Sequence, residues 1–321
     1  MNKKHLILHI GRHKCGTSAL QVHLHKDKEY LDRNNTIYPL TGRNNKVAHH
    51  DLGVILNPKL NYSSELIQKT KVKFWNEVKG YKTVIVSSEV FSNIQNTELV
   101  KYFFNDFKII TVCYFREILD YYVSAYSQKV HATNYNLQFQ EFCNSTFVNY
   151  NKQQTRWSQI SNSLICKYFH KPYLKNNDIV SDFYDSISLQ VPHLKPTEVV
   201  NKSIGGNLLY TKILLNNVTS NSKSIYTKLS EIALLKKEYS NSFFISENFA
   251  HEVRSMHAVN NEFLENSYSV YYKSFIDKPL CPNYESLNSD LAFFKDNGLN
   301  LDINKLLTFK STKQGKNKYN Q

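Results

Sequence analysis

The chain has 321 residues and a formal net charge of +13, from 40 Lys and Arg against 27 Asp and Glu. Hydrophobic residues make up 41% of the chain, which is enough for a packed core and excludes wholesale disorder. The positive charge suits an anionic partner, but the lysines are spread through the chain and no known nucleic-acid motif is present, so we expect no nucleic-acid partner.

A short apolar strand is expected at residues 5–10, followed by a loop and by a helix that begins near Thr17. The loop and the first helical turn supply two glycines, a lysine and two hydroxyls: Gly11, Lys14, Gly16, Thr17 and Ser18. A strand, loop and helix in this order point several backbone N–H groups and the positive end of a helix dipole at one place. The pattern therefore predicts a phosphate-binding turn, to which Lys14 adds a positive charge.

The order of residues in this turn indicates which kind of phosphate-binding loop it is. In ATP- and GTP-binding P-loops the lysine follows the second glycine, whereas here Lys14 precedes Gly16. In this respect the loop resembles that of the sulfotransferases that use 3′-phosphoadenosine 5′-phosphosulfate (PAPS). The longer motif is similar to the bacterial branch that includes polysaccharide sulfotransferases, through His9, Gly11, His13, Lys14, Gly16, Thr17 and Gln21. By itself, the loop also fits an ordinary strand-to-helix turn with a solvated lysine.

The resemblance implies a P-loop NTPase-like α/β fold of three layers, with a central, mainly parallel sheet flanked by helices and a helical C-terminal region. It also implies that PAPS is the cofactor and that its 5′-phosphosulfate lies on the loop. The candidate cofactor-binding residues there are Gly11, Arg12, His13, Lys14, Cys15, Gly16, Thr17 and Ser18. Transfer from PAPS requires no metal, and no Cys or His pair shows zinc-type spacing, so no metal site is expected.

Two places in the first third of the chain offer a proton acceptor for catalysis. His49 and His50 form a pair in a polar stretch where similar bacterial enzymes carry a histidine, although such a pair also fits a solvated surface. A buried strand at residues 83–88 is followed by Glu89, which also fits a cap of the next helix. Related glycan sulfotransferases use a glutamate as the base. The resemblance therefore implies Glu89, or His49 or His50, as the base, with Lys14 stabilising the leaving group.

A second motif follows the apolar run at residues 107–115, which is typical of a buried strand in a parallel sheet. Arg116 comes directly after this strand, and Ser124 lies eight residues later on a helix expected at 117–130. Sulfotransferases of this family bind the 3′-phosphate of the cofactor with an arginine and a serine at this spacing. Arg116 and Ser124 are therefore candidate cofactor-binding residues, since a guanidinium grips a phosphate with two hydrogen bonds. Either residue alone also fits a structural position.

The rest of the chain is expected to be mostly helical after one further core strand at residues 164–169. The expected helices span 175–186, 203–215, 224–239 and 247–272. We expect a single domain over 1–321, with a cofactor-binding α/β core at 1–190, a helical acceptor-side region at 191–310 and a polar tail at 311–321. The lysine-rich tail resembles a frayed terminus more than a late phosphate-binding loop.

The cysteines and the N-terminus suggest a cellular compartment. The cysteines are odd in number and scattered, as expected for free thiols in a reducing compartment: Cys15, Cys113, Cys143, Cys166 and Cys281. We find no signal peptide and no run of about 18 or more apolar residues. Animal Golgi sulfotransferases carry a membrane anchor, so we expect a soluble, cytoplasmic, bacterial enzyme.

These observations together predict a sulfotransferase that moves a sulfuryl group from PAPS to a hydroxyl of a carbohydrate, such as a bacterial surface polysaccharide or glycolipid. The positive charge suits an acidic acceptor. One alternative is the same reaction on a peptide tyrosine or a small alcohol. A second alternative is a nucleotide kinase, which the placement of the lysine disfavours. The third is a non-catalytic protein that binds glycan or nucleic acid through its basic surface.

Overall fold

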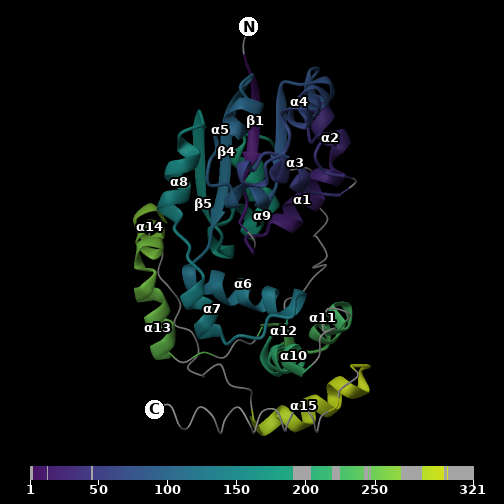
Figure 1. The fold of residues 1–321 in the computed structure, drawn as a ribbon, viewed down its shortest axis with the longest axis vertical. Helices are drawn as coiled ribbons and strands as arrows, with labels where there is room; N and C mark the ends of the chain where they lie inside the picture. The colour runs from purple at the N-terminus through teal and green to yellow at the C-terminus, as the bar shows by residue number, and fades with distance from the viewer. Residues whose placement is uncertain are drawn as a thin grey trace. The chain divides into compact units, whose positions relative to one another are not determined.

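A computed structural model of the protein describes residues 3–12, 14–44, 46–190, 204–218, 225–241, 245, 247–268, 284–299 and 302. These residues form two compact units (Figure 1). The described residues of the first unit fall within Met1–Arg116, Asn149–Thr197 and Glu262–Val270. Those of the second fall within Glu117–Val148, Glu198–Asn261 and Tyr271–Gln321.

The first unit is built around a five-stranded sheet in which all neighbouring strands are parallel, in the order β2-β3-β1-β4-β5. The strands are β1 (Lys4–His9), β2 (Thr36–Ile37), β3 (Thr83–Ser87), β4 (Phe107–Phe115) and β5 (Ser163–Tyr168). The α-helices of this unit are α1 (Thr17–Lys26), α2 (Lys28–Arg33), α3 (His50–Ile55), α4 (Ser64–Val78), α5 (Glu98–Phe103), α8 (Tyr150–Ser158) and α9 (Ile179–Ser186). Short 3₁₀ helices lie at η1 (Pro58–Leu60), η2 (Glu89–Asn93), η3 (Lys171–Tyr173) and η4 (Lys175–Asn177).

Helices cover both faces of this sheet. On one face, strand and helix residues form a buried cluster with α1 and α9 that includes Ile7, Ile85, Val112, Leu20, Val180 and Phe183. On the other face, Phe107 of β4 contacts Phe74 of α4 and Phe104, and Phe115 packs on Tyr150 of α8 with ring centroids 4.6 Å apart. Because both faces are buried, the strands consist of nearly continuous apolar runs. The expected three-layer α/β fold with a central parallel sheet is confirmed.

The described part of the second unit is helical. Its helices are α6 (Ile118–Ala132), α7 (Phe139–Ser145), α10 (Gly206–Val218), α11 (Tyr226–Leu235), α12 (Glu238–Asn241), α13 (Glu247–Met256) and α15 (Tyr284–Asp296), and α14 (Ala258–Tyr268) contributes residues to both units. Buried Glu117 caps α6 and accepts hydrogen bonds from Arg254 at 3.1 Å and Asn261 at 3.2 Å. The expected helical C-terminal region is thus present in the described residues.

Three of the long helices expected from the sequence are interrupted. The helix expected at 175–186 is a 3₁₀ turn followed by α9, because Asn176 has a φ of 54° and the Asp178 side chain caps α9 by accepting from Ser181 N. Extended backbone at Lys236 separates α11 from α12, and His257 separates α13 from α14. The start of the helix expected at 203–215 and the tail at 311–321 lie outside the described residues.

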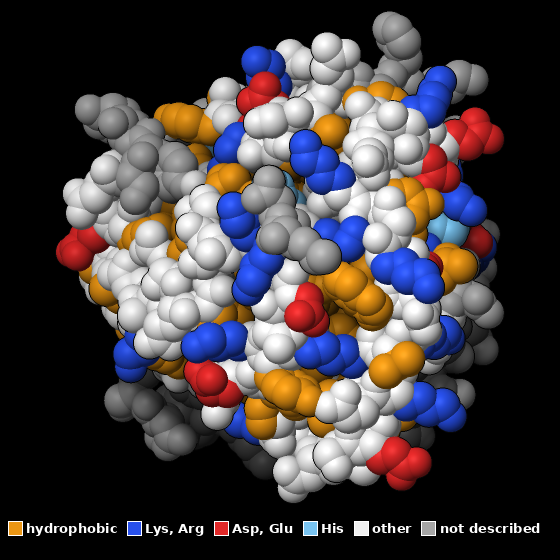
Figure 2. Space-filling model, turned by 90° about the horizontal axis from the view of Figure 1, so that it is seen from above, with side chains coloured by type: hydrophobic (Ala, Val, Ile, Leu, Met, Phe, Trp, Pro, Cys, Tyr) orange, Lys and Arg blue, Asp and Glu red, His pale blue; other side chains and the backbone are white. Residues whose placement is uncertain are grey.

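The cysteines and the surface complete the description. Within the part of the chain that the structure describes, the four cysteines are free thiols, and Cys281 lies outside it. None of the helices described here is long and apolar enough to cross a membrane. Lys and Arg side chains are distributed over the face seen in Figure 2, interspersed with acidic and apolar ones.

Candidate functional site

The loop after β1 turns tightly above the carboxyl end of that strand. Lys14 and Gly16 have φ values of 70° and 72°. A Cβ on Gly16 would come within 2.7 Å of the Phe169 ring, and one on Gly11 within 2.2 Å of Thr17 Cγ2. Both positions therefore require glycine, for space at Gly11 and for space and backbone conformation at Gly16.

The loop leads directly into the N-terminus of α1. Gly16 is the residue before the helix and has no side chain to cap it, so the first-turn N–H groups remain available to water or to an anion. Cys15 turns its thiol into the core, and burial raises the pKa of that thiol to about 11, so only its main chain faces the loop. Ser18 is exposed in the first turn, and His13 lies outside the described residues.

Three cations gather at the carboxyl ends of β1 and β4. Arg116, directly after β4, donates from Nη1 to the carbonyl oxygen of Lys14 at 3.2 Å. Arg12 donates to Gln153 Oε1 at 2.7 Å and lies over the Tyr150 ring. Burial, together with the positive charge of Arg116, lowers the pKa of Lys14 to about 8. An anion placed here would relieve this repulsion, and the carboxyl edge of a parallel sheet is where such folds bind ligands.

Glu89 lies at the same edge, directly after β3 and Ser88. Its buried carboxylate accepts hydrogen bonds from Thr17 Oγ1 and, at 3.1 Å, from Gln21 Nε2 of α1. Burial alone would raise the pKa of Glu89, but these hydrogen bonds and the nearby His50 outweigh that effect, so the pKa is lowered. Glu89 is therefore ionised and is attached through Thr17 to the first helix, at the turn that follows β1.

His49 fixes the start of α3 to the end of β3. Its ring donates from Nε2 to the Pro39 carbonyl at 2.9 Å and accepts at Nδ1 from Ser87 N at 3.2 Å, and its own N–H donates to Ser87 O. Burial, with the charge of Arg43 as a smaller cause, lowers the pKa of His49 to about 3. With both ring nitrogens occupied and no exposed surface, His49 has a positioning role in this geometry.

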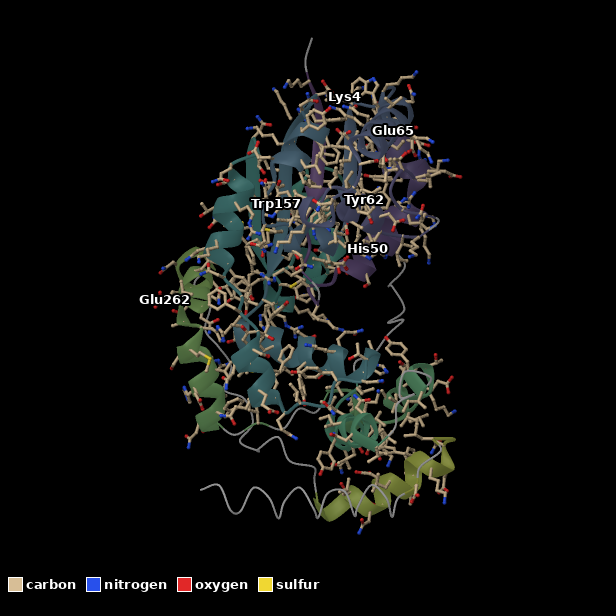
Figure 3. All side chains as sticks on the ribbon, viewed as in Figure 1. Lys4, His50, Tyr62, Glu65, Trp157 and Glu262 are labelled. Carbon is tan, nitrogen blue, oxygen red and sulfur yellow. The ribbon has the colours of Figure 1, made fainter. Side chains whose placement is uncertain are left out.

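His50 differs from His49 in exposure and in its partners. Its Nδ1 lies 2.8 Å from Ser88 Oγ and 3.6 Å from Glu89 Oε2, and 39% of its side chain is exposed. In Figure 3, His50 lies toward the end of the sheet opposite Lys4, where β1 begins. The structure therefore brings Lys14, Arg116, Glu89 and His50 to one edge of the sheet.

His9 adds a neutral ring beneath the loop. Its Nδ1 lies 2.7 Å from Ser87 Oγ, and burial lowers the pKa of His9 to about 4. Its Nε2 has no hydrogen-bond partner among the described residues, and Cε1 would be 2.9 Å from a Cβ on Gly11. The sequence motif included His9, but neither this environment nor the contact between Arg12 and Gln153 could be read from it, because their partners lie 78 and 141 residues away.

Ser124 lies on α6, in the second unit, whereas Arg116 belongs to the first. The pairing of these two residues around a phosphate stays a prediction. Among the described residues, no group of three or more His, Cys, Asp and Glu side chains could hold a metal ion.

The chain was compared with known proteins. No family model matches it, and no curated protein matches it. Among solved structures it is similar to a sulfotransferase from Alicyclobacillus acidocaldarius, with 14% sequence identity and a TM-score of 0.36. The match covers 73% of this chain and 96% of that one.

Proposed function

We propose that this protein is a PAPS-dependent sulfotransferase that acts on a hydroxyl of a carbohydrate. The observation that carries the proposal is the convergence of Lys14, Arg116 and the uncapped N-terminus of α1 at the carboxyl edge of the sheet. Gly11 and Gly16 allow the loop to turn tightly there, and the positive charge of Arg116 disfavours the charged form of Lys14, an effect that a bound anion would offset. These properties fit a donor that carries a phosphosulfate at one end and a phosphate at the other.

Each residue then has a distinct role in holding the donor. The loop at residues 11–18 would bind the 5′-phosphosulfate, with Lys14 and Arg12 as its charged partners. Arg116 would bind the 3′-phosphate, and Ser124 is proposed as a second ligand of that phosphate. PAPS supplies an activated sulfuryl group, and most of the catalysis by the protein is positioning and charge stabilisation.

The acceptor side of the reaction needs a proton acceptor. We assign it to His50 Nε2, because its other nitrogen is held by Ser88 and its side chain is exposed. Glu89, 3.6 Å away, would stabilise the imidazolium that forms. PAPS would supply the sulfuryl group to the acceptor oxygen, with the bridging oxygen as the leaving group. His50 would take the acceptor proton, and Lys14 would stabilise the charge left on the phosphate.

A thermal-shift comparison tests the donor assignment. We expect 3′-phosphoadenosine 5′-phosphate to raise the melting temperature by several degrees at a hundredfold excess over its Kd, which corresponds to about 2.7 kcal/mol. Adenosine 5′-phosphate should stabilise less, and both Lys14→Ala and Arg116→Ala should lose the response. A shift with ATP and magnesium alone would instead support a kinase, and no shift with any nucleotide would contradict the proposal.

The acceptor is tested separately, with radiolabelled PAPS and a panel of polysaccharides, a tyrosine peptide and small alcohols. Label transfer to a polysaccharide that is lost in Lys14→Ala supports the carbohydrate assignment. Transfer only to the peptide or to an alcohol would keep the reaction class and overturn the acceptor class.

A further inference from the structure

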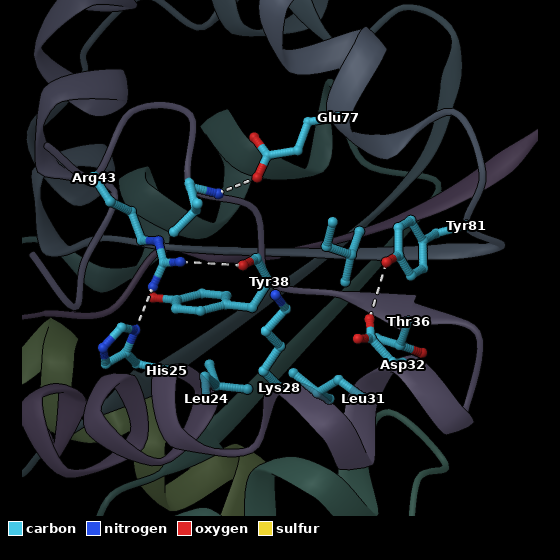
Figure 4. A pocket seen from close by; sticks show the side chains of 12 residues that line it. Leu24, His25, Lys28, Leu31, Asp32, Thr36, Tyr38, Arg43, Glu77 and Tyr81 are labelled. Atoms are coloured by element: carbon cyan, nitrogen blue, oxygen red, sulfur yellow. Dashed lines mark hydrogen bonds between the residues drawn. The ribbon is translucent and has the colours of Figure 1, made fainter. Parts of the chain in front are cut away.

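A pocket with a volume of about 290 Å³ lies beside the edge strand β2 (Figure 4). Its walls come from α1, α2, β2, the loop after β2, α4 and the turn between α4 and β3. Leu24, Leu31 and Ile37 supply apolar surface. Arg43 and His25 lie at one end of the pocket, and Asp32 and Tyr81 lie at the other (Figure 4). The pocket is thus apolar along one side and has a different polar group at each end.

Arg43 is the unusual residue of this pocket, because it is a guanidinium with only 3% of its surface exposed. It contacts His25 Nδ1 at 3.0 Å and the Tyr38 carbonyl at 3.4 Å, and it lies over the Tyr38 ring. Its Nε has no hydrogen-bond partner among the described residues. Buried cations are normally paired with an anion, and the salt bridges of the described residues do not include Arg43.

The carboxylates around the pocket already have partners. Glu77 lies near enough to Arg43 to raise its pKa somewhat, although burial has the larger effect and lowers it. The oxygens of Glu77, however, accept from the N–H groups of Leu40 and Thr41 and from the Thr41 hydroxyl. At the other end, Asp32 Oδ1 accepts from the Tyr81 hydroxyl at 2.9 Å, which leaves Oδ2 able to accept from a ligand hydroxyl.

The pocket adjoins the candidate active site. Tyr38 packs edge-on against His49, with ring centroids 4.7 Å apart, and His49 directly precedes His50. On α1, His25 lies one helical turn after Gln21, which bonds to Glu89. Arg43 and Glu89 are therefore attached to the same face of one helix, a turn apart.

We propose that this pocket binds a hydroxylated organic acid of about the size of a monosaccharide. The carboxylate of the ligand pairs with Arg43 and with Lys28, an exposed side chain that also lines the pocket. Its hydroxyls bond to Asp32 and Tyr81, and its carbon skeleton packs on Leu24 and Leu31. The Arg43 guanidinium, the Asp32 carboxylate and the apolar side chains together recognise a hydroxylated organic acid. The proposal does not depend on the proposed transferase activity.

Isothermal titration with glucuronate tests it, with glucose as the neutral probe of the same size. We expect saturable binding of glucuronate at millimolar concentration and much weaker binding of glucose. Arg43→Gln should weaken glucuronate binding by about tenfold or more, since a hydrogen-bonded charge is lost. Lys28→Gln should weaken it a few-fold, and Lys26→Gln, on the same helix but outside the pocket lining, should leave it unchanged.

Two further measurements separate a loss of binding from a loss of folding and identify the source of the ligand. The first asks whether Arg43→Gln is folded, from its thermal-shift response to 3′-phosphoadenosine 5′-phosphate. If that nucleotide does not bind the wild type, circular dichroism of the variant gives the answer instead. If Arg43→Gln is unfolded, the comparison of glucuronate binding in Lys28→Gln and in Lys26→Gln decides whether the pocket binds the acid. Equal binding of glucose and glucuronate, or unchanged binding in a folded Arg43→Gln, overturns the proposal. A disaccharide that ends in glucuronate distinguishes the source, because only an acidic residue of a glycan is expected to gain affinity from the attached sugar.

Discussion

The ammonium group of Lys14 should couple donor binding to pH. The pKa of Lys14 is about 8 in the ligand-free protein, because of burial and of Arg116. Bound phosphate favours the charged lysine and therefore raises this pKa. We expect donor binding to take up a proton at about pH 8.5 and to weaken as the pH rises further. Titration calorimetry of 3′-phosphoadenosine 5′-phosphate in two buffers of different ionisation enthalpy measures the uptake. Lys14→Arg should bind without it, and absence of uptake in the wild type would contradict this assignment.

Kinetic measurements on variants should distinguish the roles of His50 and Glu89. His50→Gln removes the proposed base, so kcat should fall by about a hundredfold or more with little change in donor affinity. Glu89→Gln keeps the hydrogen bonds in part but removes the negative charge beside His50. The protonated His50 that forms during transfer is then stabilised less, so kcat should fall by a smaller factor than in His50→Gln. We therefore expect Glu89→Gln to retain measurable activity, and complete loss in Glu89→Gln with normal activity in His50→Gln would return the role of base to Glu89.

Gly16 should tolerate no side chain. Its φ of 72° and the Phe169 ring 2.7 Å from a built Cβ both oppose alanine, so Gly16→Ala should lose about 1–3 kcal/mol of unfolding free energy and its response to donor nucleotide. Gly80 is the matched control, because nothing lies within 4 Å of its Cβ position. Chemical denaturation of both variants measures the difference, and equal stabilities would show that the loop is not held as described.

At the scale of elements, the buried histidines that connect β1, β3 and α3 should make the protein sensitive to acid. The pKa values of His9 and His49 are about 4 and about 3, below the ordinary 6.5, so the unfolded chain binds more protons in this range. Their contribution is present in full above about pH 6.5 and is lost as the pH falls through 4 toward 3, by on the order of 5–10 kcal/mol in total. Urea denaturation at several pH values should show this loss, and His49→Gln should reduce it. The exposed His251→Gln should not.

The elements also show which parts of the fold the sequence could predict. Strands β1, β3, β4 and β5 were predicted within one or two residues, because buried parallel strands are continuous apolar runs between polar ends. Strand β2 has only two residues, Thr36–Ile37, and is too short to give a pattern. The motifs also predicted that the loop and Arg116 lie close together, and Arg116 does contact the Lys14 carbonyl; their role in binding stays a prediction. Contacts such as Arg43 with His25 depend on how distant turns pack, which a single sequence does not show.

At the scale of the whole molecule, the net charge of +13 should give a second kind of anion binding that is distinct from the loop. Because Lys and Arg side chains are spread over the face seen in Figure 2, we expect a sulfated polyanion such as heparin to bind with a steep dependence on salt. Lys14→Ala and Arg116→Ala should leave that binding nearly unchanged while they abolish the response to donor nucleotide. If both kinds of binding fell together in these variants, the loop would be part of a general polyanion surface.

Lys14 also lowers the thermal stability of the protein while it serves the proposed activity. A lysine with a φ of 70°, partly buried beside Arg116, is an unfavourable choice for the folded state alone. Lys14→Gly would relieve the backbone strain and the repulsion, so its melting temperature should exceed that of the wild type in the absence of nucleotide, as differential scanning calorimetry would measure. A laboratory selection for heat resistance alone would therefore tend to discard this lysine, and with it the proposed reaction.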